Sequence, residues 1–249
     1  MTPLSRRGFI CGCLVCGTLQ AAGAQPVPGS AGCFLNAPAQ SRKLDEFISR
    51  GIGRQDFAST TGDPDFDRQF GRAIIRLAGF FGERPAFGIV NDEHHDNAWA
   101  MPQTPPGAEF GTVGFGSTML AKLRDFDPSG MAIMAIVAHE FAHVAQYRRG
   151  AIAELNRGQQ NVRRSELHAD YLTGCYLGWI KRNQPLVSVR LAGQFMEAIG
   201  DTNVASENHH GTHAERIASV ETGFALAKAE DLAFEEYFDR GKAYILRTF

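Results

Sequence analysis

The sequence has no apolar stretch long enough to cross a membrane and no block of basic residues. Its N-terminal apolar run, Gly8–Leu19, is 12 residues long, whereas a transmembrane helix needs about 20. The formal net charge is −2, and the basic patch typical of nucleic-acid-binding proteins is absent. We therefore expect no nucleic-acid partner and no transmembrane segment in the mature chain.

Internal repeats and low-complexity tracts are also absent. Of the 249 residues, 44% are hydrophobic and 21% are charged, which is the ordinary balance of a globular domain with its own core. Nothing in this balance predicts an oligomeric state.

Residues 1–24 have the parts of a cleavable signal peptide. Arg6 and Arg7 precede the apolar run, and the small residues Ala22-Gly23-Ala24 follow it. The segment Ser5-Arg6-Arg7-Gly8-Phe9-Ile10 resembles the twin-arginine export signal, with an ordinary secretion signal as the alternative. Either signal predicts an exported bacterial protein that is periplasmic or secreted.

Cysteine is scarce outside this segment. Three of the five cysteines lie within residues 1–24, which leaves Cys33 and Cys175. These two could pair in an oxidising compartment, although a sequence does not show whether their geometry permits a disulfide. Because Cys175 lies in an apolar helical run, a buried free thiol is the alternative.

The remaining chain predicts an α+β fold that is mostly helical. Residues 25–60 are expected to be a linker or N-terminal segment, since 25–40 are rich in Pro, Gly, Ala and Ser, and residues 61–249 are expected to form the domain. Short apolar or glycine-rich segments predict strands over 85–90 and 111–116, and residues 119–123 predict one or two helical turns. The expected helices span 42–48, 65–81, 129–149, 162–181, 187–199, 212–229 and 231–246.

The segment His139-Glu140-Phe141-Ala142-His143 matches the HExxH pattern. Positions four apart share one face of a helix, so His139 and His143 can offer two imidazole nitrogens to one zinc ion. Glu140 lies beside that face and can serve as general base toward a water that the metal activates. The alternative is a pair of surface histidines, but the preceding segment Met131–Ala138 is apolar throughout and predicts a buried helix.

A second acidic motif follows at Glu166-Leu167-His168-Ala169-Asp170. Glu166 and Asp170 are one helical turn apart and point the same way. We expect Glu166 to be the third metal ligand and Asp170 to orient one of the histidine rings by accepting its other N–H. His168 is a competing ligand on the opposite side of the helix, and two solvent-facing acids are the alternative.

These motifs resemble the gluzincin metallopeptidases, which combine HExxH with an ExxxD helix. The chain is similar to the bacterial neutral zinc metallopeptidase family and to soluble relatives of the prenyl-protein and heat-shock membrane protease families. The resemblance covers roughly 95–225 and implies a zincin-like domain with a small, edge-exposed sheet beside the HExxH helix. Further segments that agree are Asn97-Ala98-Trp99-Ala100, Tyr171-Leu172-Thr173-Gly174-Cys175, Ala198-Ile199-Gly200-Asp201 and His210-Gly211-Thr212-His213-Ala214-Glu215-Arg216.

The resemblance also implies roles for residues outside the two motifs. His210 or Arg216 would lie near the active site and stabilise an oxyanion. The alternatives are that His210 or Thr212 caps a helix and that Arg216 binds Asp170 or another acid.

An extended peptide substrate can bind by adding a strand to a sheet edge. Residues 111–116 are the candidate edge, with 97–100 as the neighbouring strand. Asn97, Ala98 and Gly114 are the expected substrate-binding residues, and an ordinary strand without such a role is the alternative.

The expected function is therefore zinc-dependent hydrolysis of peptide bonds, with one Zn²⁺ ion and a peptide or protein substrate. The alternative is a catalytically weak zinc-containing domain that binds a protein or cell-wall partner, and a structural zinc site is a third possibility. The cluster Asp92-Glu93-His94-His95-Asp96 matches no standard helical metal site and is expected to be a solvated loop.

Overall fold

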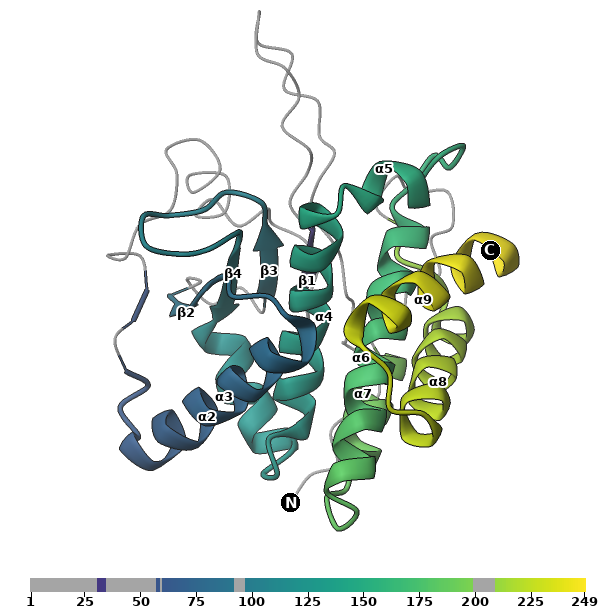
Figure 1. The fold of residues 1–249 in the computed structure, drawn as a ribbon. Coiled ribbons are helices and arrows are strands. Elements are labelled where there is room, and N and C mark those ends of the chain that lie inside the picture. Colours follow the sequence, from purple (N-terminus) through teal and green to yellow (C-terminus); the bar gives the residue numbers. More distant parts are fainter. Residues whose placement is uncertain (1–30, 35–56, 59, 92–96, 199–208) are drawn as a thin grey trace, which may run out of the picture.

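The structure is a computed structural model that describes residues 31–34, 57–58, 60–91, 97–198 and 209–249 (Figure 1). The expected signal peptide, the expected helix over 42–48 and the cluster at 92–96 lie outside these residues. Within the described ranges, no helix has both the length and the apolar character that crossing a membrane requires.

One sheet of four strands lies in the N-terminal half of the fold. The strands are β1 (Ala31–Phe34), β2 (Ala86–Val90), β3 (Asn97–Met101) and β4 (Thr112–Gly116). Their order is β1-β3-β4-β2, in which β3 is antiparallel to both neighbours and β2 is parallel to β4. The three strands expected from the sequence are confirmed, but β1 lies inside the segment that was expected to be a linker.

The order of the strands corrects the expectation of a free edge. β4 is hydrogen-bonded to β3 on one side and to β2 on the other, so residues 111–116 are interior to the sheet and that prediction is wrong. β3 is also paired on both sides, because β1 occupies its outer edge. Period-2 alternation reveals strands but carries no information about their neighbours.

Helices make up most of the described chain and confirm the mostly helical α+β class. The long helices begin and end within a few residues of the predicted limits, α3 is longer than the turns expected there, and α5 was not predicted. They are α2 (Pro64–Phe81), α3 (Ser117–Phe126), α4 (Met131–Arg148), α5 (Ala151–Leu155), α6 (Arg163–Asn183), α7 (Arg190–Ala198), α8 (His213–Ala229) and α9 (Phe234–Thr248).

α4 is the central helix. It contacts the sheet through β1, β3 and β4 and contacts α6 on its other side, and Figure 1 shows it between these two parts. Every residue from Met131 to Gln146 is buried. Its start is anchored by Asp127, whose Oδ2 accepts the amide of Ala132 at 2.8 Å, and its end is followed by Gly150 with φ 62°. Such a helix fixes the direction of every side chain it carries.

α6 and α8 pack with their backbones in close contact. A Cβ on Gly174 would lie 2.0 Å from the carbonyl oxygen of Val220, and one on Gly223 would lie 2.0 Å from that of Tyr171. Glycine therefore lets α8 approach α6 more closely than any other residue would allow.

The contact predicts that Gly223→Ala destabilises the fold. The added methyl group must push α6 and α8 apart, and we expect the free energy of unfolding to fall by about 1–3 kcal/mol, measured by urea denaturation. The matched control is Gly79→Ala on α2, where a Cβ meets nothing within 4 Å; it should raise stability by about 0.5–1 kcal/mol. Equal effects of the two substitutions would contradict the close packing.

Candidate metal centre

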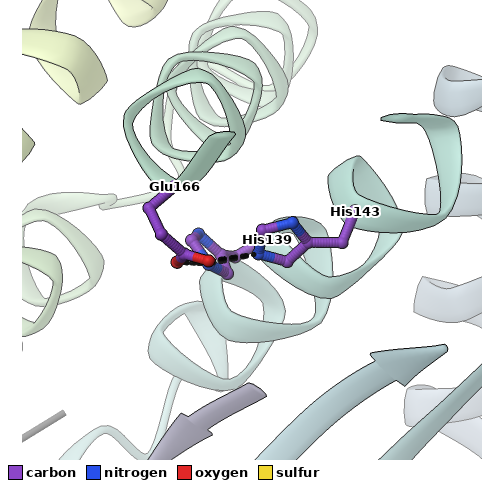
Figure 2. Close-up of side chains that lie close together, drawn as sticks. All are labelled: His139, His143 and Glu166. Atoms are coloured by element: carbon purple, nitrogen blue, oxygen red, sulfur yellow. Dashed lines mark hydrogen bonds and ion pairs between the residues drawn. The ribbon is translucent and has the colours of Figure 1, made fainter. Parts of the chain in front are cut away.

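Three side chains from α4 and α6 converge on one point. Figure 2 shows His139 and His143 on α4 facing Glu166 on α6. The two Nε2 atoms are 3.0 Å apart, His139 Nε2 is 3.2 Å from Glu166 Oε2 and His143 Nε2 is 3.3 Å from Glu166 Oε1. Among the described residues this is the one group of three or more His, Cys, Asp or Glu side chains whose ligand atoms gather in this way.

The spacing of these atoms is that of ligands around a small metal ion. Ligand atoms about 2.0–2.1 Å from one ion at tetrahedral angles stand about 3.3 Å apart. The observed separations of 3.0–3.3 Å match this value. The three residues expected from the sequence are therefore brought together by the fold at ligand distances.

The hydrogen-bond partners of the two Nδ1 atoms determine the tautomer of each histidine ring. His139 Nδ1 lies 3.0 Å from Asp170 Oδ1, an acceptor when ionised, so Nδ1 donates and Nε2 keeps its lone pair. His143 Nδ1 lies 3.0 Å from Gln146 Oε1, which leads to the same tautomer. Both Nε2 lone pairs and the Glu166 carboxylate therefore point at one another, which is the donor set that binds a cation.

Both acids are held in their ionised forms. Burial works to raise the pKa of Glu166, but with no metal bound the positive charge on the rings of His143 and His210 and hydrogen bonds from His139 and His143 outweigh it and keep this pKa well below its ordinary value. The neutral tautomers described above are the forms of the two rings that bind a metal ion, whose charge would lower this pKa in the same direction. Burial also opposes ionisation of Asp170, yet Arg216 and His139 lower its pKa below the usual range. The centre therefore presents carboxylates rather than carboxylic acids to a metal ion.

Arg216 binds Asp170 and is fully buried. Its Nε and Nη2 donate to the two carboxylate oxygens of Asp170 at 2.7 and 2.8 Å. This is one of the alternatives that the sequence left open, and it makes Arg216 a residue that holds Asp170 against His139. Thr212 caps α8 and forms a capping box with Glu215, which fixes the turn that carries Arg216 inward.

Gln146 was missed by the sequence analysis. Its Oε1 accepts from His143, and its Nε2 lies 2.8 Å from the carbonyl oxygen of Ser165 and 3.1 Å from His168 Nδ1. His168 Nε2 in turn donates to the carbonyl oxygen of Phe238 at 3.0 Å. Burial lowers the pKa of His168 to about 4, so the ring is neutral. The sequence did contain a signal for this contact, because Gln146 lies one helical turn after His143 and can therefore reach its ring.

His168 is therefore a hydrogen-bond partner of Gln146 and lies outside the ligand cluster, so the competing assignment of His168 as a ligand is not supported. His210 also contacts Glu166, with Nδ1 3.1 Å from Oε2. It is followed by Gly211, whose φ is 99° and where a Cβ would lie 2.7 Å from Leu167. The contact with Glu166 is established; a role of His210 in stabilising an oxyanion stays a prediction.

Glu140 follows His139 on α4 and is buried with it. The expected substrate residues Asn97 and Ala98 are on β3, which contacts α4. Gly114 is on interior strand β4, and a Cβ there would lie 2.1 Å from the Trp99 ring. The absence of a side chain at Gly114 accommodates Trp99, so its expected role in substrate binding is not supported.

Cys175 is a buried free thiol. Burial raises the pKa of this thiol well above its ordinary value, which keeps it protonated and unreactive. In the structure Cys175 is thus the buried free thiol that the sequence left open as the alternative to a disulfide.

Comparison of the chain with protein-family models, curated proteins and solved structures found no match.

The hydrogen bond between Asp170 and His139 predicts a loss of metal affinity in Asp170→Asn. An amide holds the His139 tautomer less firmly than a carboxylate, and we expect the affinity for Zn²⁺ to fall by about 10- to 100-fold, measured by competition with a chromophoric chelator. Because Arg216 then lacks its buried counter-charge, the free energy of unfolding should fall as well.

The matched control for this variant is His213→Gln, which alters an exposed histidine at the start of α8. It should bind Zn²⁺ like the unaltered chain. An unchanged affinity in Asp170→Asn would show that Asp170 does not orient His139.

Proposed function

We propose that this chain is a zinc-dependent endopeptidase, in which His139, His143 and Glu166 hold one Zn²⁺ ion and Glu140 is the general base. The observation that carries the proposal is the convergence of two imidazole lone pairs and one carboxylate at ligand spacing, with a glutamate next to the first histidine on the same buried helix.

The donor set favours zinc in a catalytic type of site. Two histidines and one carboxylate are three protein ligands, and catalytic zinc sites keep a fourth position open, whereas structural sites close the shell with a fourth side chain. No fourth His, Cys, Asp or Glu joins the cluster within the described part of the chain. When bound, zinc polarises a substrate carbonyl and acidifies a water molecule.

Glu140 supplies the proton transfers in this proposal. As the residue after His139, it projects from α4 beside the face that carries the two histidines. Its carboxylate takes the proton of the attacking water and returns it to the leaving amine when the peptide bond breaks. One group thus serves as base and then as acid, and a domain that only binds zinc has no need of it.

Asn97 supports a peptide-binding role for β3. The residue is 2% exposed, and within the described residues neither Nδ2 nor Oδ1 has a hydrogen-bond partner. Buried amides without partners are rare in folded proteins. An amide that both donates and accepts is suited to the main chain of an extended peptide, and β3 is one of the strands that contact α4. Export by the twin-arginine route remains part of this proposal.

Glu140→Gln tests the catalytic role. The substitution keeps the size of the side chain but removes the base, so we expect the rate of casein hydrolysis to fall by about 10²- to 10⁴-fold while bound zinc stays at one ion per chain. The matched control is Glu236→Gln on α9, which removes an exposed carboxylate and should leave the rate unchanged. Hydrolysis by Glu140→Gln at the original rate would refute the assignment.

Asn97→Ala tests the role of β3 in substrate binding. Loss of a hydrogen bond worth about 1 kcal/mol lowers kcat/KM by about five-fold. Since the amide makes no hydrogen bond to a described residue, the free energy of unfolding should stay level or rise. A fall in stability with an unchanged kcat/KM would instead indicate that Asn97 is structural.

A further inference from the structure

The outer edge of β3 is occupied by four residues from the N-terminal part of the same chain. β1 runs antiparallel to β3, with Ala31 opposite Ala100, Gly32 opposite Trp99, Cys33 opposite Ala98 and Phe34 opposite Asn97. This is the arrangement in which an extended peptide adds to a sheet edge, by main-chain hydrogen bonds. β1 therefore takes the place that a bound peptide would take.

This edge belongs to a strand that packs against the helix carrying two of the candidate metal ligands. β1 and β3 both contact α4, which carries His139, Glu140 and His143. Figure 1 shows β1 beside α4. The register ends with Phe34 opposite Asn97, the residue whose amide makes no hydrogen bond within the described chain. The edge of β3 thus combines main-chain pairing, a side-chain amide suited to a peptide and contact with the helix that carries His139 and His143.

We propose that the outer edge of β3 is a peptide-binding edge and that residues 31–34 are its ligand in the full chain, so that a substrate must displace β1. The inference rests on the proposed peptidase function for the identity of the competing ligand, an extended protein segment. The occupation of the edge by β1 stands independently of that function.

Tethering explains how so short a strand remains bound. β1 is 4 residues long, and a free peptide of this length pairs weakly with a sheet edge. A segment attached to the same chain is present at an effective concentration on the order of millimolar. If β1 is paired about nine tenths of the time, an external peptide binds about ten-fold more weakly than it would to an open edge.

The exchange of β1 is tested in the full chain with a double variant, Gly32→Pro and Cys33→Pro. In an antiparallel pair, alternate residues form the hydrogen-bonded pairs, so one of these adjacent residues donates its N–H to β3 and proline removes that donor. The matched control is Gly29→Pro with Ser30→Pro, which places the same two prolines immediately before β1.

Hydrogen exchange measures whether β1 has left. The β3 amides that face β1 should exchange faster in the β1 variant than in the control, while those that face β4 keep their protection and show that the sheet is intact. If exchange in β3 is the same in both variants, the proposal is overturned.

Peptide binding measures whether the edge has become available. The probe is a fluorescent peptide of residues 29–36 with Cys33→Ala, titrated by anisotropy into zinc-loaded protein that also carries Glu140→Gln. The β1 variant should bind it at least about ten-fold more tightly than the control. Equal affinities, or no binding to the β1 variant at millimolar peptide, overturn the proposal.

Hydrolysis separates this inference from the proposed function. With Glu140 intact, the β1 variant should cleave casein several-fold faster than the control, and the peptide should inhibit it competitively. If peptide binding improves but neither protein cleaves casein, the peptidase function fails and the peptide-binding edge stands. If both cleave casein at one rate despite tighter peptide binding, substrate does not use this edge and the displacement of β1 by substrate is refuted.

Discussion

Three acceptor groups that face one another in a buried space repel unless a cation lies between them. His139 and His143 turn their Nε2 atoms toward each other and toward Glu166 at 3.0–3.3 Å, and all three residues are at most 1% exposed. Water cannot relieve such repulsion in a buried site. The fold must therefore hold these groups in place, and a metal ion would offset the electrostatic cost of bringing them together.

The restraints on this centre come from elements far apart in the sequence. Arg216 on α8 holds Asp170 against His139, while Gln146 links His143 through His168 to the backbone of α9. The close packing of α6 and α8 at Gly174 and Gly223 carries the first of these connections. The C-terminal helices thus act on the candidate metal ligands although none of their side chains belongs to the ligand cluster.

In the proposed function, the sheet holds the substrate beside the metal centre. A metal centre on α4 can act on a peptide only if the peptide is held extended beside that helix, and β3 is a neighbouring strand with a side-chain amide able to bind it. β1 pairs with that same strand. If substrate binds this edge as proposed, binding of substrate and release of β1 are one equilibrium, set by the difference in free energy between two similar strand pairings.

The sequence by itself determined the features that depend on local periodicity. Residues four apart share a helix face, so His139 with His143, and Glu166 with Asp170, could be paired in advance. Short apolar or glycine-rich segments located β2 and β4, and the family resemblance located β3. The tertiary structure alone decided that β4 is interior, that β1 pairs with β3, and that Gln146 supports His143. The local sequence of each segment does not identify the segment that it will contact, because these contacts depend on the packing of the whole chain.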